Sequence, residues 1–314
     1  MKADAPGKLV VSGAYSVLFG APALVAAVNR RVFAESDKVS DFEAPEVTEG
    51  MKLLEKSGTI GQRPWYDAGA LRQDTQKLGL GSSAAICVSS LALLLGERLQ
   101  SQGKQWDTST TKEVLYPLAL EAHRLAQGGG SGVDIAAACF GGVISARRAS
   151  SPQGPLEIES TRLPKGLTFE VWASEQSAST AQFVKSVFAA EKNEASRFAP
   201  LMAAQSEASR EAARACEQDD SPGFVSALRS QFTALCGLGQ LAQVPIVLAS
   251  VAKLHKMLDQ NACFLPSGAG GGDISLYVGP SASSESFRAR AQDLGLSEVE
   301  LALGAAGLQL DFTS

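Results

Sequence analysis

The sequence of 314 residues contains no long run of apolar side chains. The longest, from Ala84 to Leu95, is interrupted by two serines and is shorter than the roughly 20 residues that a membrane-spanning helix needs. The first six residues lack the apolar core of a signal peptide. Five scattered cysteines in mostly apolar surroundings are typical of reduced, buried thiols. These absences predict a soluble cytoplasmic protein with no membrane partner.

Positive charge and histidine are also scarce. With 28 Lys and Arg against 33 Asp and Glu the formal net charge is −5, whereas a protein that binds nucleic acid normally presents a basic face. Only two histidines are present, and no pair of cysteines has the spacing of a zinc site. We therefore expect no nucleic-acid partner and no structural metal. Any anionic ligand must be held by a few local cations and by backbone N–H groups.

A phosphate-binding loop of the form Gly-x-x-x-x-Gly-Lys-Ser/Thr is absent as well, but another glycine-rich stretch, Gly-Leu-Gly-Ser-Ser-Ala-Ala, occupies positions 79–85. Gly79 and Gly81 permit a sharp turn and a close approach to bare backbone. Ser82 or Ser83 can cap the helix that the following alanine begins. Because a helix N-terminus carries partial positive charge and free donors, this stretch predicts a site for the phosphates of a nucleotide.

Two other interpretations of this stretch stay open. Glycine and serine before a helix are ordinary loop and capping residues, and their spacing alone does not distinguish that role from a phosphate site. The pattern Gly79-x-Gly81-x-x-Ala84 also fits the loose dinucleotide-binding fingerprint, which should follow a β-strand. Residues 71–76 are polar and poorly suited to a strand, and this disfavours the dinucleotide interpretation.

Two further glycine-rich turns follow along the chain. Residues 127–132 precede a helix of small residues that carries a lone acid, Asp134, in its first turn. That acid either complements the helix dipole or lies beside a substrate hydroxyl. Residues 265–273 form the third turn, before an apolar strand. Glycines at this density indicate that backbone passes close to something bulky, since each of them weakens regular structure.

The remaining pattern predicts a β-rich beginning followed by alternating helices and strands. Short apolar runs between glycine turns indicate strands, and apolar residues at helical spacing indicate helices. Periodicity is weak over residues 36–74. Strands are expected over residues 8–11, 22–28, 31–34, 141–148, 168–173, 274–278 and 308–310, and helices over 84–100, 112–126, 182–192, 200–217, 223–237, 246–260 and 284–294.

Three glycine-rich turns in this order resemble the motifs of the GHMP small-molecule kinases, a superfamily that includes galactokinase, homoserine kinase, mevalonate kinase and phosphomevalonate kinase. The first motif is similar to residues 5–24, the second to residues 79–85 and the third to residues 267–272. The resemblance implies an α+β fold of two domains. Residues 1–155 would form a nucleotide-binding half like domain 2 of ribosomal protein S5, and residues 156–314 a ferredoxin-like half that contributes the third motif.

Details within the superfamily favour the phosphomevalonate kinases, whose central motif is similar to residues 122–137 and whose third motif resembles the turn that ends at Asp273. There are departures from the superfamily pattern. Many relatives carry an acid where this chain has Ala14. In mevalonate kinases a magnesium-binding glutamate precedes the central aspartate, but the corresponding position here holds His123, with Glu121 close by. The resemblance therefore leaves the magnesium shell open and weakens a mevalonate kinase assignment.

The resemblance also implies residue roles in a phosphoryl transfer from ATP with Mg²⁺. Lys8 would lie between the γ-phosphate and the acceptor and lower the pKa of Asp134, which would accept or orient the acceptor's proton. A hydroxyl of Ser82 or Ser83 would bind Mg²⁺. The residues expected to bind the nucleotide are Gly79, Leu80, Gly81, Ser82, Ser83, Ala84, Gly270 and Gly271.

A further set of residues is expected to bind the acceptor, because a molecule that carries both a carboxylate and a phosphate needs several donors in an acidic protein. The two arginines of this set could instead be solvated charges at a strand end, and its histidine could be a buried, hydrogen-bonded one. The set is Tyr15, His123, Ser131, Gly132, Arg147, Arg148, Ser177, Ser179, Thr180, Ser267, Gly268 and Ala269.

The predicted reaction is phosphorylation of mevalonate 5-phosphate to mevalonate 5-diphosphate, a step of isoprenoid precursor synthesis. One alternative is mevalonate kinase or another kinase for a small alcohol. A second alternative, from a different class, is a catalytically silent protein that binds a metabolite, although the presence of both Lys8 and Asp134 counts against it. A monomer and a homodimer are both compatible with the sequence.

Overall fold

The computed structural model describes residues 1–314 except residues 40–41, 59, 74–75, 149–155, 177–178 and 313–314. The chain forms two compact units: residues 1–9, 26–142 and 302–314 form the first, and residues 10–25 and 143–301 form the second. Both units combine helices with antiparallel strands, so the predicted α+β class is confirmed. The predicted domain boundary after residue 155 stays a prediction. The compact units are not continuous segments of the chain: residues 10–25 group with the second unit, and residues 302–314 group with the first.

Two long strands contribute to both units. β1 (Lys2–Ser12) and β2 (Ala23–Val39) begin the fold, and β2 is one strand of 17 residues where the sequence predicted two shorter ones. The polar residues in its middle do not end the strand. Arg31 forms an ion pair with Asp4 of β1 and donates to the carbonyls of Ala306 and Gly307 at 2.7 and 2.6 Å. β12 (Gln309–Asp311) pairs with β1, and β3 (Pro64–Asp67) pairs with β2.

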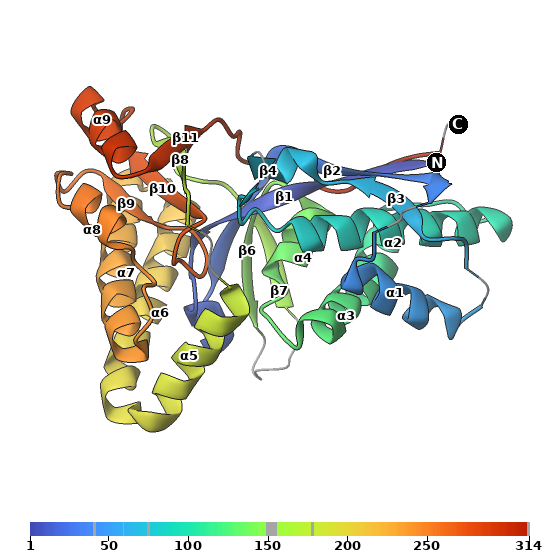
Figure 1. The fold of residues 1–314 in the computed structure, drawn as a ribbon, viewed down its shortest axis with the longest axis horizontal. Helices are drawn as coiled ribbons and strands as arrows, with labels where there is room; N and C mark the ends of the chain where they lie inside the picture. The colour runs from blue at the N-terminus through green and yellow to red at the C-terminus, as the bar shows by residue number, and fades with distance from the viewer. Residues whose placement is uncertain (40–41, 59, 74–75, 149–155, 177–178, 313–314) are drawn as a thin grey trace. The chain divides into compact units, whose positions relative to one another are not determined.

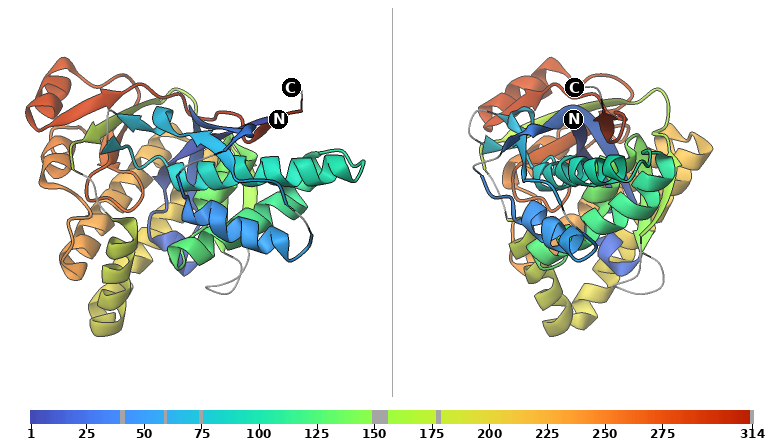
Figure 2. Two further views of the ribbon diagram at one scale, coloured as in Figure 1. Left: turned by 45° about the vertical axis from the view of Figure 1, so that its right-hand side comes forward. Right: turned by 90° about the vertical axis from the view of Figure 1, so that its right-hand side faces the viewer.

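The helices of the first unit lie on one face of these strands, as Figures 1 and 2 show. They are α1 (Pro45–Glu55), α2 (Ser82–Ser101), α3 (Tyr116–Gln127) and α4 (Val133–Phe140). α2 is long and apolar enough to cross a membrane by length and composition, but 67% of that apolar window is buried within the protein. It is therefore explained as the central core helix of this unit, since a buried core helix can be as long and as apolar as a membrane-spanning one.

Several short elements of the first unit were not predicted. α1 begins at Pro45 within the region of weak periodicity. A 3₁₀ turn (Gly69–Leu71) leads to β4 (Arg72–Gln73), which pairs with β5 (Gln76–Lys77), although the sequence indicated poor strand formation there. A π-helical turn (Thr110–Leu115) precedes α3 and includes the first residues of the helix predicted over 112–126. These pieces connect the larger elements and lead directly into the first glycine-rich turn.

The second unit contains a hairpin and a four-stranded antiparallel sheet. β6 (Val143–Arg148) pairs with β7 (Leu156–Thr161), which the sequence did not indicate. The sheet has the order β11-β8-β10-β9 and consists of β11 (Leu296–Val299), β8 (Thr168–Ser174), β10 (Ile274–Gly279) and β9 (Cys263–Pro266). A short 3₁₀ helix, η1 (Ser16–Phe19), lies in the connection between β1 and β2.

Five helices complete the described part of the second unit: α5 (Thr180–Asn193), α6 (Ala195–Gln218), α7 (Ser221–Ala242), α8 (Ala249–His255) and α9 (Glu285–Asp293). α6 and α7 run side by side in Figures 1 and 2. One apolar core cluster joins α5, α6 and α7 to the β1–β2 connection through Tyr15, Phe183 and Met202. A second cluster packs α8 and α9 on the sheet around Trp172 and Phe287.

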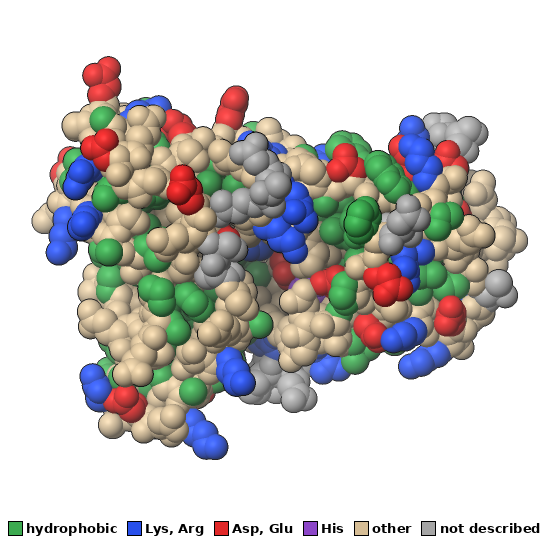
Figure 3. Space-filling model, in the orientation of Figure 1, with side chains coloured by type: hydrophobic (Ala, Val, Ile, Leu, Met, Phe, Trp, Pro, Cys, Tyr) green, Lys and Arg blue, Asp and Glu red, His purple; other side chains and the backbone are tan. Residues whose placement is uncertain are grey.

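The cysteines and the surface agree with the composition. None of the five cysteines is in a disulfide, and all are buried except Cys236, which is half-buried. On the face shown in Figure 3, acidic and basic side chains are interspersed. The prediction that the chain has no nucleic-acid partner stays a prediction.

Candidate active site

The first glycine-rich turn leads directly into α2. Gly79 and Gly81 have φ angles of 68° and 75°, in the left-handed region where glycine is favoured. Gly81 is the N-cap, the helix begins at Ser82, and no side chain caps it. The expected capping by Ser82 or Ser83 is therefore wrong, because both serines already lie in the first helical turn. The first N–H groups of a helix have no acceptor within it, so this turn presents donors and partial positive charge to an anion.

Lys8 of β1 lies along this turn. Its backbone N–H donates to the carbonyl of Leu80 at 2.8 Å, and its ammonium donates to the carbonyl of Gly79 at 3.2 Å. A Cβ atom placed on Gly81 would lie only 3.0 Å from Cγ and 3.1 Å from Cε of Lys8. The glycine therefore makes room for the lysine stem, and the ammonium is held at the edge of the turn predicted to bind phosphate.

A buried histidine connects the same turn to the central acid. Nε2 of His123, from α3, lies 3.3 Å from Oγ of Ser83 and 3.7 Å from Oδ2 of Asp134. The His123 residue is only 7% exposed. Oδ1 of Asp134 accepts the N–H of Ile135 at 3.0 Å in the first turn of α4. The structure thus places His123 between the two groups, in the position where the resemblance pointed to a metal-binding glutamate.

Glu121, the acid nearest in sequence to that position, is engaged elsewhere. Its carboxylate accepts two hydrogen bonds of 2.9 Å from Arg124 on the exposed side of α3. This hydrogen bonding lowers the pKa of Glu121. Glu121 is consequently a surface ion-pair partner of Arg124.

The second glycine-rich turn connects α3 to α4. Gly128 ends α3 with a φ of 72°, and Gly132 is the N-cap of α4 with a φ of 78°. Ser131, which directly precedes Gly132, is half-buried, and Gly132 itself is buried. The turn therefore brings the predicted substrate residues Ser131 and Gly132 to the start of the helix that carries Asp134.

One buried acid near this turn was not found from the sequence. Glu46, in the first turn of α1, is 5% exposed and accepts a hydrogen bond of 2.6 Å from Nε2 of Gln127. Gln127 is the last residue of α3, so the bond anchors the end of α3 from which the second turn departs. The only signal that could have identified Glu46 was an acid directly after Pro45, a typical helix start.

The third glycine-rich turn, in the second unit, follows β9. The N–H of Gly271 donates to the carbonyl of Ile246 at 3.0 Å, and the N–H of Asp273 donates to the carbonyl of Gln176 at 2.8 Å. A Cβ atom on Gly270 would lie 2.0 Å from the carbonyl oxygen of Ile246. The bulky neighbour that the glycine density predicted is therefore, at Gly270, the protein's own backbone. Beside Gly268 a Cβ atom would meet nothing within 4 Å, so the open part of the turn lies there.

Tyr15 holds this open part of the turn. Its hydroxyl donates to the carbonyl of Ala269 at 2.6 Å, and the residue is 4% exposed. Burial raises the pKa of the Tyr15 hydroxyl. Oγ of Ser267 donates to the carbonyl of Val10 at 2.9 Å. The hydroxyl groups of Tyr15 and Ser267, both predicted to bind substrate, thus donate to backbone carbonyls instead.

The other predicted substrate residues of the second unit are dispersed. Arg147 forms an exposed cross-strand ion pair with Glu157 at 2.6 Å, and Arg148 follows it, half-buried, at the end of β6. Ser179 is the N-cap of α5 and accepts the N–H of Gln182, and Thr180 begins the helix. Ser177 lies outside the described residues. Arg147 is therefore an exposed strand residue that pairs with its cross-strand neighbour, as in the alternative interpretation of a solvated charge.

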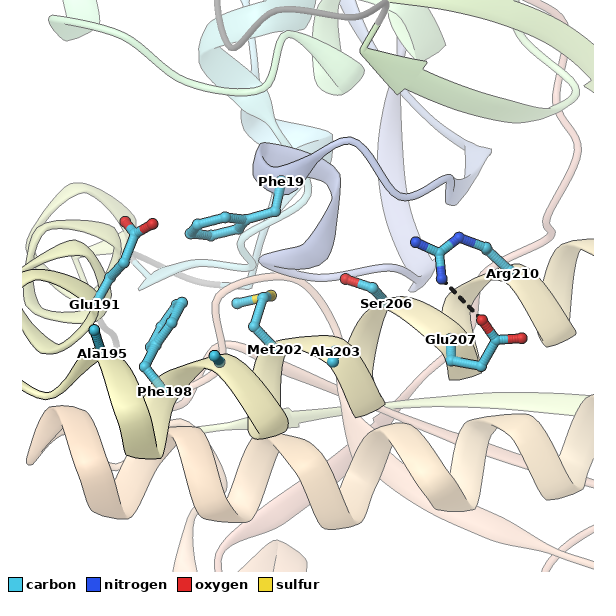
Figure 4. Close-up of a pocket in the computed structure, with 10 residues that line it drawn as sticks. Phe19, Glu191, Ala195, Phe198, Met202, Ala203, Ser206, Glu207 and Arg210 are labelled. Atoms are coloured by element: carbon cyan, nitrogen blue, oxygen red, sulfur yellow. Dashed lines mark hydrogen bonds and ion pairs between the residues drawn. The ribbon is translucent and has the colours of Figure 1, made fainter.

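A hollow in the second unit lies away from these residues. It has a volume of about 600 Å³ and is lined by η1, the C-terminal end of α5 and the first two thirds of α6. In Figure 4 the ring of Phe19 lies above Phe198 and Met202, and Glu207 pairs with Arg210 at the rim. None of the predicted site residues lines it. Its lining is mainly apolar, and two of its charged side chains, Glu207 and Arg210, pair with each other.

Known proteins resemble the part of the chain that contains the candidate site of the first unit. Residues 75–142 match the family model of the GHMP kinases N terminal domain. The matched segment contains the first two glycine-rich turns, Ser83, His123 and Asp134. The resemblance recognised from the sequence is thereby confirmed for this domain.

Individual relatives extend the match over most of the chain. The mevalonate kinase of Aeropyrum pernix is 28% identical over 182 residues, which is 48% of this chain and about half, 52%, of that enzyme. The phosphomevalonate kinase of Streptomyces sp. (strain CL190) is 25% identical over an alignment that covers 87% of this chain and 88% of the relative. The structure of Streptococcus pneumoniae phosphomevalonate kinase in complex with phosphomevalonate and AMPPNP has a TM-score of 0.77 at 20% identity and covers 96% of this chain and 99% of that one. The fold is that of the GHMP kinases, as predicted.

Proposed function

We propose that the chain is a phosphotransferase that uses ATP and Mg²⁺ to phosphorylate mevalonate 5-phosphate, because residues 75–142 match the family model of the GHMP kinases N terminal domain. One observation carries the proposal: two groups converge on the turn Gly79–Ser83. Lys8 bonds to it directly, and Asp134 is linked to it through His123. A cation and an acid at a phosphate-binding turn are the parts that phosphoryl transfer needs. The phosphomevalonate kinase relative that aligns with 87% of the chain supports the choice of acceptor.

The turn and Lys8 perform the electrostatic part of the reaction. Backbone N–H groups at the start of α2 hold the phosphates of ATP, since that helix end carries no side-chain cap. The Lys8 ammonium, which bonds to Gly79 O, neutralises charge that develops on the transferred phosphoryl group. Positioning and charge neutralisation account for most of the catalysis in this reaction class, because little covalent chemistry falls to the protein.

The side chains beside the turn fit Mg²⁺ as a companion of the nucleotide. Ser83 Oγ and Asp134 Oδ2 are hard oxygen donors, and Mg²⁺ commonly takes one or two protein ligands and completes its shell with waters and substrate phosphates. Among the described residues, no group of three or more His, Cys, Asp or Glu could hold a metal ion on its own. When bound, Mg²⁺ supplies further neutralisation of the phosphates. We assign Ser83, with Ser82 beside it, to that shell.

Asp134 and the second turn receive the acceptor. The acceptor's phosphate is already ionised near neutral pH, so Asp134 orients the acceptor rather than removing a proton from it. The start of α4 at Gly132 and the half-buried Ser131 supply donors for its negative charges. We place the reaction in the cytoplasm and involve no nucleic-acid or membrane partner.

A second candidate function is mevalonate kinase. The observation that favours it is the 28% identity to the Aeropyrum pernix enzyme over a segment that includes the first unit's site. The same turn, lysine and acid would serve an alcohol acceptor, for which Asp134 would act as the general base.

The deciding experiment is a coupled assay of ADP release with mevalonate and mevalonate 5-phosphate in parallel. We expect turnover with mevalonate 5-phosphate and a kcat/KM for mevalonate at least about 10²-fold lower, because an empty phosphate subsite leaves its donors unpaired. Asp134→Asn serves as the control that ties ADP release to this site. Efficient turnover of mevalonate alone would establish the second candidate, and no turnover of either would remove the proposal.

A further inference from the structure

The connection between β1 and β2 is held by buried amide and hydroxyl groups from two distant helices. Gln231 of α7 accepts the N–H of Gly13 at 2.9 Å and donates to Oγ of Ser12 at 2.7 Å. Gln205 of α6 donates to the carbonyl of Ala14 at 2.9 Å. These side chains are 1% and 0% exposed. Ordinary core packing does not account for them, because burying an amide is unfavourable unless it satisfies other polar groups.

A third helix residue completes the set. Oγ of Ser209 lies 2.8 Å from Oγ of Ser16, the first residue of η1, and both are fully buried. On the apolar side of η1, the ring of Phe19 lies 5.5 Å from the rings of both Phe188 and Phe198. Backbone and side chains of residues 12–16 are therefore fixed from α6 and α7, which leaves the connection little freedom.

Tyr15 lies within this fixed connection, directly before η1. Its φ of 64° is in the left-handed region, where a bulky non-glycine residue is strained, so the surrounding bonds must impose the conformation. In that conformation its hydroxyl reaches the carbonyl of Ala269 at 2.6 Å. Ala269 directly follows Gly268, beside which the third turn is open, whereas Gly270 and Gly272 are packed against backbone.

We propose that Tyr15, held by Gln205 and Gln231, is a positioning residue that sets the conformation of the open part of the third glycine-rich turn, residues 267–269. The inference rests on the proposed function, since the third turn is one of the three glycine-rich motifs that resemble those of the GHMP kinases. Tyr15 acts through Ala269 and touches no reacting atom. The two glutamines supply the bonds that keep the Tyr15 backbone in its strained conformation.

The test compares two buried tyrosines that each donate to a backbone carbonyl. Tyr15→Phe removes the bond to Ala269, and Tyr277→Phe removes a similar bond of 3.2 Å to Ser281, at the far end of β10 from the turn. Both changes should lower Tm slightly. Only Tyr15→Phe should lower kcat/KM for the acceptor, by about tenfold, the factor that corresponds to the usual net contribution of one hydrogen bond. We expect its KM for ATP to stay within about twofold of the wild-type value.

Amide hydrogen exchange supplies a readout that does not depend on activity. Exchange at residues 267–272 should accelerate in Tyr15→Phe and in Gln231→Met, and should be unchanged in Tyr277→Phe. A folded Tyr15→Phe protein with wild-type constants for the acceptor overturns the inference, and so does unchanged exchange in the turn. If the wild-type protein phosphorylates neither acceptor, the proposed function fails, and the exchange result alone decides whether Tyr15 and Gln231 order the turn.

Discussion

Replacing Gly81 by alanine would add one methyl group at the point where Lys8 crosses the phosphate-binding turn. The left-handed φ of 75° costs a non-glycine residue about 1–2 kcal/mol. The new Cβ atom would also lie 3.0 Å from Cγ and 3.1 Å from Cε of Lys8, tighter than ordinary contact, so the lysine stem must move. We expect the ammonium to lose its bond to Gly79 and kcat to fall by about 10²-fold, as when other groups that stabilise developing charge are removed.

Gly103→Ala is the matched control for this substitution. Gly103 follows α2 with a φ of 67°, and a Cβ atom there would meet nothing within 4 Å. It therefore carries the same backbone strain without touching Lys8. Both variants should lower Tm by roughly 2–6 °C, but only Gly81→Ala should lose turnover in the coupled ADP-release assay.

The comparison has a clear contrary result. If Gly81→Ala loses stability to the same extent as Gly103→Ala and keeps wild-type turnover and ATP affinity, Lys8 does not need its place on the turn. The phosphate site would then have to lie away from residues 79–83.

Three further predictions concern single side chains. Asp134→Asn and Lys8→Met should each lower kcat by about 10²-fold or more with little change in ATP affinity; near-normal turnover in both would contradict the assignment of this site. His123→Leu should leave Ser83 and Asp134 without their shared partner and lower kcat by about tenfold, and His123→Gln, which can still donate and accept, should recover part of the loss. Burial lowers the pKa of His255, which stacks on Phe232, so the unfolded chain binds its proton first and stability falls as pH drops below about 6.5. Urea unfolding at pH 7.5 and 5.5 should show a smaller loss for His255→Gln than for the wild-type protein, and equal losses would assign the acid sensitivity to other groups.

The sequence was sufficient for the elements whose stability is local. α2, the strand Ile274–Gly279 and the final helix lie within a few residues of their predicted positions, because a long apolar run or a regular period determines them. The first glycine-rich turn was also predictable, since its glycines adopt conformations that other residues avoid.

Other elements depend on tertiary contacts that no local pattern contains. α1 buries a glutamate, and its Gly50 lies so close to Leu91 of α2 that a Cβ atom would come within 2.5 Å of Cδ2 of Leu91. α6 was expected to begin at Pro200, since proline favours the first turn of a helix, but it begins at Ala195 and continues through the proline. Only Glu194 separates it from α5.

The candidate site shows the same division. The motifs identified Lys8, the turn at residues 79–83 and Asp134, which the structure links through hydrogen bonds or the contact with His123. The sequence did not show that the hydroxyl of Tyr15 is occupied by Ala269 or that Arg147 pairs with Glu157. Both facts depend on partners from other parts of the chain, which a motif does not specify.

The burial of the cysteines gives each compact unit its own chemical reporter. Cys87 and Cys139 lie in the first unit, and Cys216, Cys236 and Cys263 lie in the second. Burial raises the pKa of every one of these thiols, so the reactive thiolate is scarce until the surrounding structure opens. A thiol reagent added to the native protein, with the modified peptides identified by mass, would therefore time the opening of each unit separately and without any engineered label.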